Sequence, residues 1–520
     1  MQPRIEIGGP SWSSVRVTRH LPGELEGLEQ LCKNLWWCWN DNAKALFKYV
    51  DPDIWHRYGH NPMMILDRVS LKRYKQLSKD GEFLGRLHAV MDEFNAYMAE
   101  KQRRGNPSIA YFCMEYGLDT SLQIYSGGLG ILAGDYLKES SDMNVNLVAV
   151  GLLYRYGYFT QRITPQGNQV AEYNAQDFLR IPAEPVTDAE GKWITVSCQL
   201  PGRELHARIW KVPVGRTDLY LLDTDFEDNI PEDRQVTYQL YGGDWENRLK
   251  QEILLGIGGI RALRAIGLHP AIYHSNEGHA AFIGLERLRE YMYEQKMDYS
   301  EAMELVRASG LFTTHTPVPA GHDAFDEDML YRYFGHYPSR FGISWETLLG
   351  LGKVNVDDHN ERFSMSVLAA NCSQNVNGVS MLHGKVSQDI FAHMYKGYLP
   401  EELHISYVTN GVHYPTWASK EWKAVHAKVF GPEFQTHHYD KRCFEGIYNV
   451  SDEEIWDTRK ILKAELIRII NDRLSNPELS GHYSPSEIVH IKENLREDVL
   501  TIGFARRFAT YKRATLLFSD

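Results

Sequence analysis

A predicted strand, a glycine-rich turn and a predicted helix follow one another in residues 109–142, and this order limits the fold more than any other feature of the sequence. Residues 109–116 (IAYFCMEY) are apolar and aromatic, as in a buried strand, and residues 129–142 (LGILAGDYLKESSD) have helical spacing. Between them, YSGGLG at residues 125–130 places bare backbone N–H groups at a helix N-terminus. These groups attract an anion, and glycines let it approach closely. The same pattern also fits an ordinary tight turn, so both interpretations stay open.

The composition is that of a large globular chain with several domains. Its 520 residues correspond to about two to four domains. A hydrophobic fraction of 43% is ample for large cores and argues against disorder. The net charge of −12 argues against nucleic acid or an anionic membrane as a partner of the whole surface. Any anion site must therefore be a local cluster.

The cysteines and the absence of long apolar runs indicate a cytoplasmic protein. Six cysteines are scattered without a CxxC pair, so the sequence indicates neither a zinc site nor a disulfide framework, and a reducing compartment is expected. The first residues lack the apolar core of a signal peptide. No apolar run reaches the length of about 18 residues that a membrane span needs.

The N-terminal part of the chain is predicted to be a helical extension that covers residues 1–105. Helical spacing extends over residues 21–50 and again over residues 82–100. The apolar residues that share one face of the second helix are Phe83, Leu87, Val90, Met91, Phe94 and Met98.

The first helical stretch contains an unusual density of tryptophan, with Trp36, Trp37 and Trp39 inside the run LWWCWN. Large aromatic side chains dominate protein cores, and these three are too crowded for all of them to be exposed on one helix face. We therefore expect them to be buried. A platform on which sugar rings stack is the alternative.

Three later segments each run from a predicted strand into a polar loop. They read AIYHSNEGH at residues 271–279, GLFTTHTPVPAGH at residues 310–322 and SYVTNGVHYPTW at residues 406–417. Strands that alternate with helices indicate a parallel α/β sheet, and ligands bind such sheets beyond the carboxyl ends of the strands. We expect these loops and the glycine turn to converge on one crevice.

The polar residues of these loops suit a ligand rich in hydroxyl groups. The candidates are Asn276, Glu277, His279, His315 and Asn410. Sugar hydroxyls both donate and accept hydrogen bonds, which this mixture of amide, imidazole and carboxylate can match. A hydrogen-bonded structural histidine at a strand end is an equally valid interpretation of His315. No metal-binding motif and no Ser-His-Asp spacing is evident.

Two further segments complete the first α/β domain. Residues 193–224 alternate in polarity as strands do, and we expect an antiparallel insertion there. Residues 244–266 have helical spacing and include Gly256, Gly258 and Gly259, which imitate a nucleotide-binding loop. Since no strand precedes these glycines, we interpret them as a close-packing face of the helix.

The last part of the chain is predicted to begin a second α/β domain. Residues 451–454 (SDEE) form a capping box pattern at the start of a helix, and residues 498–504 (DVLTIGF) have the pattern of a buried strand. Directly after them, RRFATYKR at residues 506–513 carries four cations, which favours an oxyanion site over a solvated basic face. The chain stops at Asp520, after one strand and an incipient helix, so we expect this domain to be cut off.

Segments of the chain resemble the glycogen/starch (α-glucan) phosphorylases, and they occur in the order of that family. These segments are GGLGILAGD (127–135), LLYRYGYFTQ (152–161), RLKQE (248–252), NEGHAAF (276–282), FTTHTPVPAGHDAF (312–325), NGVSMLHG (377–384), TNGV (409–412) and RRFATYKR (506–513). The tryptophan-rich start NLWWCWN is similar to the N-terminal extension of the bacterial and archaeal type. The match extends from about residue 108 to the end of the sequence.

The resemblance implies a fold of the GT-B type, in which two Rossmann-like domains face a cleft. The extension would cover residues 1–105, the first domain residues 106–408 and the start of the cofactor-binding domain residues 409–520. It also implies the transfer of a glucosyl unit from the end of an α-1,4-glucan to inorganic phosphate, with retention, which yields α-glucose 1-phosphate. The implied partners are α-glucan and phosphate, and the resemblance allows a homodimer.

The resemblance also assigns roles to individual residues on the substrate side. By position, Gly127, Gly128 and Leu129 would hold the substrate phosphate and sugar, His315 and Asn410 the glucosyl 6-hydroxyl, and Glu277 and His279 the acceptor. Better-known members of the family have Asp in place of Glu277, which leaves the acceptor preference undetermined.

The basic cluster would serve the phosphate groups. By position, Arg507 and Lys512 match the phosphate clamp, Tyr511 matches a contact to a sugar hydroxyl, and Trp417 and Arg506 match neighbours of pyridoxal 5′-phosphate. The family usually has Lys in place of Arg506. In the family this cofactor acts through its own phosphate, which exchanges a proton with the substrate phosphate. The lysine that forms the Schiff base belongs to a glycine-rich motif that residues 1–520 lack, so we expect these residues alone to be inactive.

Two other functions remain as alternatives. A nucleotide-sugar-dependent glucosyltransferase similar to glycogen synthase shares the glycine turn and the basic cluster, although the matches at 312–325 and 506–513 disfavour it. A non-catalytic protein that binds glucan through its tryptophans is the other alternative.

Overall fold

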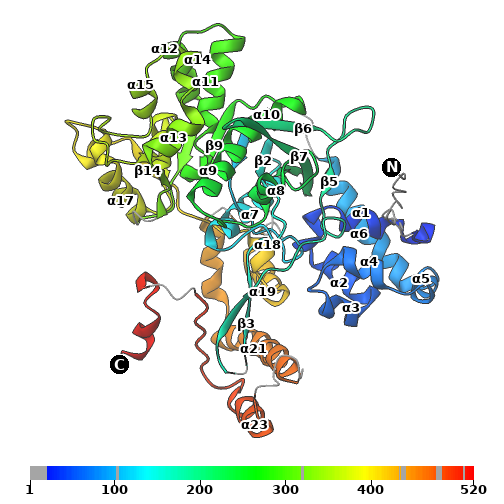
Figure 1. The fold of residues 1–520 in the computed structure, drawn as a ribbon. Helices are drawn as coiled ribbons and strands as arrows, with labels where there is room; N and C mark the ends of the chain where they lie inside the picture. Colours follow the sequence, from blue (N-terminus) through cyan, green and yellow to red (C-terminus); the bar gives the residue numbers. More distant parts are fainter. Residues whose placement is uncertain are drawn as a thin grey trace, which may run out of the picture. The chain divides into compact units, whose positions relative to one another are not determined.

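The computed structural model describes residues 20–100, 105–164, 166–317, 321–431, 434, 438, 441–475, 483–506 and 510–519, and for Tyr511 the backbone alone. The chain divides into two compact units (Figure 1). Unit 1 comprises Met1–Phe159 and Tyr173–Trp417, and unit 2 comprises Thr160–Glu172 and Ala418–Asp520. The domain boundaries expected from the sequence stay a prediction.

A ten-stranded sheet forms the centre of unit 1, in the order β14-β13-β10-β9-β1-β2-β8-β7-β5, with β6 paired to β7. Its strands are β1 (Ile109–Phe112), β2 (Leu147–Leu152), β5 (Glu184–Pro185), β6 (Thr195–Leu200), β7 (Arg203–Val214), β8 (Thr217–Asp223), β9 (Ile272–Asn276), β10 (Gly310–Thr313), β13 (Asn375–Gly378) and β14 (Ile405–Tyr407). Every pair from β14 to β8 is parallel, whereas β5, β6 and β8 all pair antiparallel to β7. The predicted mixed α/β class, parallel sheet and antiparallel insertion are confirmed.

Helices and a small two-stranded sheet surround the large sheet of unit 1 (Figure 1). The helices are α7 (Gly128–Asp142), α8 (Pro231–Arg234), α9 (Trp245–Ile253), η4 (Leu254–Gly258), α10 (Gly259–Ala265), α11 (Ile283–Glu294), α12 (Tyr299–Ala308), α13 (Glu327–Phe334), α14 (Tyr337–Phe341), α15 (Trp345–Leu349), α16 (Met365–Asn371), α17 (Met381–Phe391) and α18 (Tyr414–Trp417). The small sheet pairs β11 (Ala324–Phe325) antiparallel to β12 (Phe363–Ser364). Among the described helices, none is both long and apolar enough to cross a membrane.

Helices α9 and α10 are joined by a π-helical turn, η4, and the glycines of this stretch pack closely. A Cβ atom on Gly256 would lie 2.7 Å from Cβ of Phe282, and one on Gly259 would lie 2.8 Å from the Phe112 ring. Real Cβ atoms do not approach so closely, so these positions need glycine. The predicted close-packing face is confirmed.

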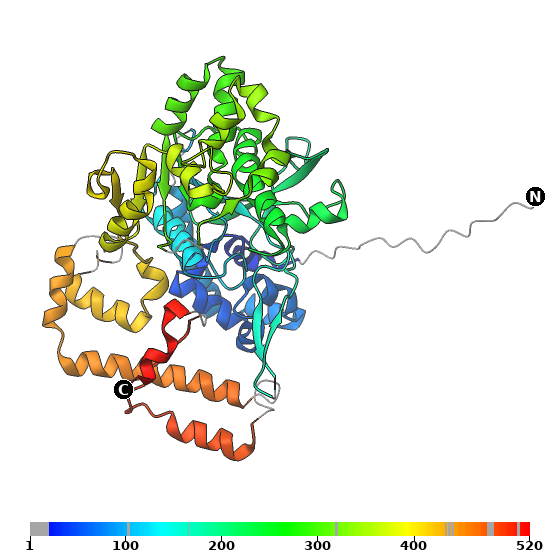
Figure 2. The same ribbon diagram turned by 60° about the vertical axis from the view of Figure 1, so that its left-hand side comes forward.

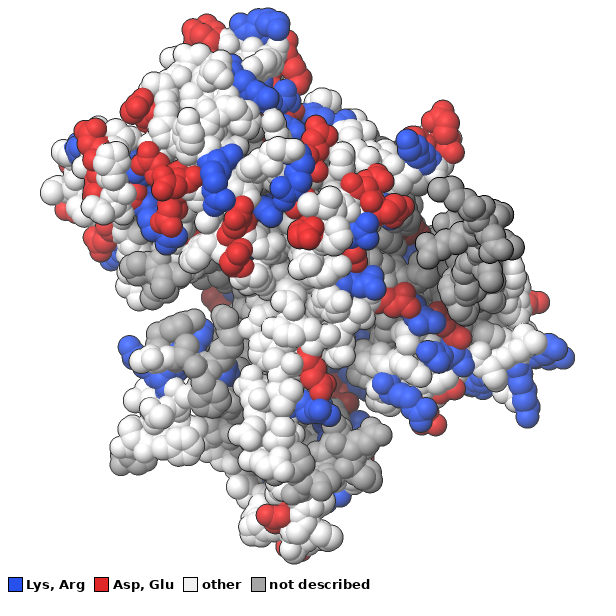
Figure 3. Space-filling view, viewed as in Figure 1, with Lys and Arg blue, Asp and Glu red and all other residues white. Residues whose placement is uncertain are grey.

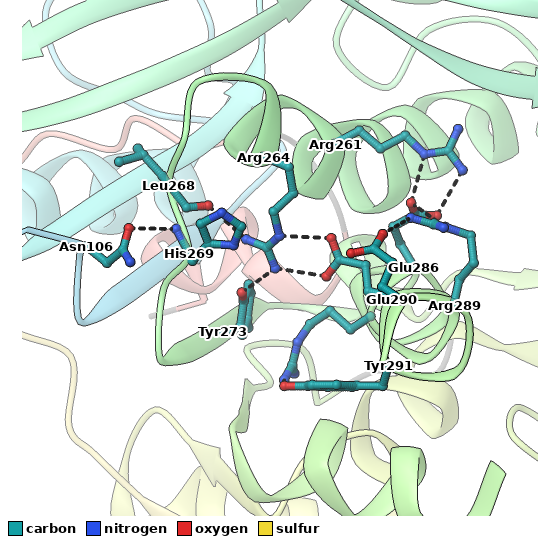
Figure 4. Close-up of polar contacts among 12 residues, drawn as sticks. Asn106, Arg261, Arg264, Leu268, His269, Tyr273, Glu286, Arg289, Glu290 and Tyr291 are labelled. Carbon is teal, nitrogen blue, oxygen red and sulfur yellow. Dashed lines mark hydrogen bonds and ion pairs between the residues drawn. The ribbon is translucent and has the colours of Figure 1, made fainter. Parts of the chain in front are cut away.

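Arginines of α10 clamp that helix to α11 through two forked ion pairs (Figure 4). Arg261 donates to both oxygens of Glu286 at 2.9 and 3.0 Å, and Arg264 donates to both oxygens of Glu290 at 2.8 and 2.9 Å. Arg264 also donates to Tyr273 of β9 at 2.7 Å. We call these four charged residues the α10–α11 ladder, and it fixes both helices against the sheet.

The N-terminal helices gather in one cluster in both ribbon views (Figures 1 and 2). They are α1 (Glu26–Cys32), α2 (Asp41–Val50), α3 (Pro52–Arg57), α4 (Pro62–Arg68), α5 (Leu71–Leu77) and α6 (Gly81–Ala99), with short turns at Gly23–Leu25 and Leu35–Cys38. Residues 21–50 form several short helices because Asn34 and Asn40 each cap a new one, accepting hydrogen bonds from Trp36 N and Ala43 N.

The three tryptophans of LWWCWN are buried, with exposed fractions of 3, 2 and 5% for Trp36, Trp37 and Trp39. The Trp37 ring lies edge-on against the rings of Phe47 and Trp55, at centroid distances of 5.9 and 6.2 Å. The prediction that these residues are core is confirmed. Rings buried in this way offer no open face for a sugar to stack on.

The described part of unit 2 is mainly helical and contains one hairpin. It contains β3 (Thr160–Ile163), β4 (Gln169–Glu172), α19 (Lys420–Phe430), η9 (Lys441–Asn449), α21 (Asp452–Leu474), α23 (Pro485–Asn494), η10 (Thr510–Lys512) and η11 (Ala514–Phe518). Ser451 caps α21 as predicted, but Glu454 pairs with Lys428 at 2.9 Å in place of the reciprocal bond of a capping box.

The strand predicted at residues 498–504 is wrong. These residues form no strand, and Leu500 and Ile502 are 84 and 64% exposed. A strand exists only through hydrogen bonds to a neighbour, and in the described part of unit 2 only β3 and β4 are strands, paired with each other.

On the face drawn in Figure 3, acidic and basic side chains are interspersed.

Candidate functional site

The carboxyl ends of β9 and β10 bring three of the predicted site residues together. His315 Nε2 lies 2.5 Å from Oδ1 of Asn276, and the backbone N–H of His315 donates to Oε1 of Glu277 at 2.5 Å. The two strands are parallel neighbours, so their loops leave the same edge of the sheet. The structure therefore confirms the expected convergence for the loops after β9 and β10.

Glu277 holds a strained position at the centre of this cluster. Its φ of 73° is rare for any residue other than glycine. The side chain is 6% exposed, and burial raises the pKa of its carboxyl to about 7. The same oxygen that binds His315 N–H also accepts from Thr316 Oγ1 at 3.3 Å. The carboxyl therefore fixes the loop after β10 and can exchange a proton near neutral pH.

Both histidines of the cluster are neutral. His279 is buried, and its Nε2 accepts the backbone N–H of Met114 at 3.0 Å, so its own proton resides on Nδ1. Burial lowers the pKa of His279 to about 3 and that of His315 to about 4. Neutral imidazoles can both donate to and accept from hydroxyl groups, which suits an uncharged polar ligand.

The glycine turn next to this cluster is organised by a buried carboxylate. Oε2 of Glu115, the residue after Met114, accepts backbone N–H bonds from Ser126 and Gly127 at 2.7 and 3.2 Å. Its Oε1 accepts from the Tyr241 hydroxyl at 2.7 Å. Glu115 is 3% exposed and thus fixes the turn from within.

The backbone N–H groups that follow those bound by Glu115 belong to the first turn of helix α7. Gly128, Leu129 and Gly130 are the first residues of α7, whose N–H groups have no partner within the helix. A Cβ atom on Gly127 or Gly128 would meet no atom within 4 Å, so a ligand can approach this backbone. The preceding N–H groups are taken by Glu115, and Gly130 is buried against that carboxylate. Gly128 and Leu129 are therefore the residues whose N–H groups an anion could use. The role of Gly127, Gly128 and Leu129 in binding stays a prediction.

Arg248 contacts two acidic side chains, those of Glu252 and Asp323. Its Nη2 lies 2.5 Å from Oδ2 of Asp323, its Nε lies 3.1 Å from Oε1 of Glu252, and its guanidinium lies 4.6 Å from the Tyr241 ring centroid. Burial raises the pKa of the fully buried Glu252 well above its usual value, which favours the neutral form of this carboxyl. Burial alone would also raise the pKa of Asp323, but Arg248 outweighs it and the pKa falls. We call Arg248, Glu252 and Asp323 the α9 charge group.

Sequence reasoning missed Glu115 and the α9 charge group as parts of the site. Glu115 could have been noticed as a carboxylate within an otherwise apolar strand pattern. Arg248 and Glu252 lie in RLKQE, one turn apart on a helix, which hints at a pair. No local pattern reveals that Asp323, far along the chain, is their third member.

The remaining predicted residues of unit 1 lie on the segment after β14. The backbone N–H of Asn410 donates to Val379 O at 3.0 Å, and its side chain is exposed. Trp417 donates its indole N–H to Asp135 at 2.7 Å and is 54% exposed. No contact joins the Asn410 and His315 side chains within the described residues, so their shared role stays a prediction.

The predicted phosphate clamp belongs to unit 2. Arg507 and the side chain of Tyr511 lie outside the described residues. Arg506 is exposed, and Lys512 is half-buried in the short turn η10. The roles proposed for these four residues stay predictions.

Comparisons with known proteins agree with these motifs. Two protein-family profiles match the sequence, one described as a protein of unknown function (DUF3417) over residues 21–122 and one described as carbohydrate phosphorylase over residues 268–476. A maltodextrin phosphorylase of Thermococcus litoralis is 39% identical over 97% of the chain and 60% of its own length. A glycogen phosphorylase of Mycobacterium tuberculosis is 40% identical over the same shares. A glycogen phosphorylase of Aquifex aeolicus is 36% identical over 95% of the chain and 71% of its own length.

Proposed function

We propose, from the premise that this chain belongs to the carbohydrate phosphorylase family, that the protein carrying it is an α-1,4-glucan phosphorylase. It would use inorganic phosphate to release α-glucose 1-phosphate from the non-reducing ends of glucan, with retention. The chain spans about 60% of the length of two of its curated relatives. The activity, the substrates and the cofactor are therefore proposed for the protein that carries this sequence.

The observation that carries the proposal is the cluster of Glu277 with two neutral imidazoles, His279 and His315, next to the glycine turn. Both imidazoles are neutral, and the Glu277 carboxyl titrates near pH 7, so the cluster suits sugar hydroxyls better than a charged ligand. His279 binds Met114, and the following residue, Glu115, binds the turn. Met114 and Glu115 thus connect the residues proposed to bind sugar hydroxyls with the glycine turn proposed to bind an anion.

The roles of these residues follow from their chemistry. The N–H groups at the start of α7 would hold the substrate phosphate and stabilise its charge in the transition state, which for one such donor is typically worth about 3–4 kcal/mol. His315 and Asn410 would hold the hydroxyls of the glucosyl unit. Glu277 would keep the backbone of His315 in place, since it already accepts that N–H.

Pyridoxal 5′-phosphate is proposed as the cofactor, and the described residues fit it in part. The Trp417 ring is 54% exposed while its N–H is held by Asp135, which leaves an aromatic face for a planar ring. The guanidinium of Arg506 suits a phosphate group. When bound, the cofactor would supply a phosphate that exchanges a proton with the substrate phosphate.

The decisive experiment measures glucose 1-phosphate after maltodextrin and inorganic phosphate are added to the protein, with no nucleotide sugar present. Release of glucose 1-phosphate supports the proposal. Glucosyl transfer that needs a nucleotide sugar would instead support the glucosyltransferase alternative. Glucan binding without either reaction would support a non-catalytic protein, although the burial of Trp36, Trp37 and Trp39 removes the platform proposed for it.

The proposed phosphate clamp has its own test. We expect Arg507→Ala to lower phosphorolysis at least about a hundredfold without unfolding the protein. Kinetics at varied phosphate concentrations measure the effect. Unchanged turnover with an unchanged dependence on phosphate would remove Arg507 from the clamp.

We also propose a cellular compartment for the protein. All six cysteines are free, five of them buried, which supports a reducing compartment such as the cytoplasm.

A further inference from the structure

The turn at the end of unit 1 lies against helix α7 through a row of polar contacts. His413 is fully buried, with Nε2 3.0 Å from Oδ2 of Asp142 and Nδ1 2.8 Å from Oγ1 of Thr416. Oδ2 of Asp135 accepts both the indole N–H of Trp417 at 2.7 Å and the backbone N–H of His413 at 3.2 Å. We call these five residues the α7 clamp.

The hydrogen bonds of the clamp have one consistent direction. Lys138, 2% exposed, can only donate, and its Nζ lies 3.2 Å from Oγ1 of Thr416. The Thr416 hydroxyl therefore keeps its own hydrogen for Nδ1 of His413. The proton of His413 then resides on Nε2 and is donated to Asp142. A neutral imidazole satisfies both of its nitrogens in this arrangement. Thr416 and His413 thus link the buried cation of Lys138 to the partly exposed carboxylate of Asp142.

The N-terminal helices supply the other wall of the clamp. The Trp39 ring lies edge-on to the His413 ring at 5.5 Å, and Nζ of Lys138 lies 5.9 Å from the Trp39 ring centroid. The Tyr97 hydroxyl of α6 donates to Oδ1 of Asp142 at 2.7 Å. The tryptophan-rich stretch, which the proposed chemistry does not use, thus covers this cluster.

We propose that Thr416, His413 and Asp135 are positioning residues. They fix the position of the segment from Asn410 to Trp417 relative to the glycine turn at the start of α7. The same helix carries the glycine turn at its first residues and the clamp along its buried side. Asn410 and Trp417 lie at the two ends of the clamped segment. The effect of the clamp on catalysis rests on the proposed function, whereas its effect on the position of the segment can be measured without any activity.

The test compares Thr416→Val with Thr416→Ser in the full-length protein. Valine keeps the shape of threonine but leaves Lys138 and His413 without their common partner, whereas serine retains the hydroxyl. Hydrogen exchange followed by mass spectrometry should show exchange at residues 409–417 faster by about tenfold or more in the valine variant. The specificity constant for glucan should fall at least about tenfold in that variant and remain close to the original in the serine variant.

A matched control removes a different buried hydroxyl. Thr217 is 1% exposed, and its Oγ1 has no hydrogen-bond partner in the described part of the chain. Thr217→Val should therefore change neither exchange at residues 409–417 nor the specificity constant.

Two outcomes would overturn the inference. One is an exchange rate at residues 409–417 and a specificity constant that both stay unchanged in Thr416→Val. The other is faster exchange spread evenly over the sheet, with activity falling only as the folded fraction falls, because this shows a loss of overall stability instead. If the unsubstituted protein shows no phosphorolysis, the proposed function fails, and the local exchange rates still decide on the clamp.

Discussion

The arginines of helices α9 and α10 pair differently with two groups of carboxylates. In the α10–α11 ladder, Arg261 and Arg264 each bind both oxygens of one carboxylate, and Glu286 also binds Arg289. In the α9 charge group, Arg248 faces both Glu252 and Asp323. Matched charges satisfy each other, whereas a second carboxylate can stay buried only as the neutral acid. The excess of acid lies beside the candidate site, whereas the ladder joins α10 to α11 and to strand β9.

This comparison predicts that Arg248 is the most costly of these charges to remove. Arg248→Met should lower the free energy of unfolding by about 3 kcal/mol, because Asp323, whose side chain is 21% exposed, would remain in the structure without its cation. Urea denaturation measures the loss, and phosphorolysis should be lost with it. The matched variant Arg261→Met should cost less, since Glu286 would keep Arg289, which lies 2.8 Å away. Equal losses in the two variants would end the distinction between the groups.

A smaller effect is expected from Glu277, the other buried acid of the site. Its carboxyl loses its proton near the ordinary pKa of 4.5 when unfolded and near 7 when folded. Between these values the folded state binds more protons, so its stability falls as the pH rises. Glu277→Gln keeps the acceptor for His315 but removes this titration. The variant should therefore gain about 3 kcal/mol relative to the original between pH 5 and pH 8. A difference that does not change with pH would contradict the raised pKa.

The ladder should respond in stability alone. Glu286→Gln weakens the bonds from Arg261 and Arg289, and we expect it to lower the free energy of unfolding by about 2 kcal/mol. Turnover of the folded protein should be unchanged, because these residues lie away from the site. Thermal unfolding and kinetics on the same sample measure both. A large change in turnover with little change in stability would place the ladder in the site.

The smallest effect is expected at Glu252. Because burial favours the neutral form of its carboxyl, Glu252→Gln introduces no new change of charge and should alter the free energy of unfolding by less than about 1 kcal/mol. Denaturation at neutral pH measures it. A loss as large as that of Arg248→Met would show that Glu252 is ionised and that the α9 charge group is balanced after all.

Local patterns predicted the sheet and its loops well, because strand and helix periods are written in neighbouring residues. The segments that begin at residues 271, 310 and 406 each contain a parallel strand whose loop lies at one edge of the sheet. The apolar run at residues 498–504 has an equally strong pattern but forms no strand, since a strand also needs a partner to pair with.

The organisation of the candidate site could be predicted only in part. His315 and Glu277 were expected to lie close together, and they do. The positive φ of Glu277 and the contact between Arg248 and Asp323 could not be foreseen, because both depend on segments that meet only in the folded chain. Nor does any spacing reveal that His413 contacts Trp39.

The π-helical turn η4 determines which side chains of this helical stretch point toward the site. It separates Arg248 in α9 from Arg261 and Arg264 in α10. A π turn holds one residue more than the α-helical turn it replaces, and each residue of an α-helix turns the chain by about 100°. Deletion of one residue within Leu254–Gly258 would thus rotate everything downstream by about that angle while leaving every charge in the sequence. The ladder would lose Glu286 and Glu290 although no arginine had changed. The length of this turn, together with the glycines that let it pack closely, keeps one helical stretch in contact with both groups of carboxylates.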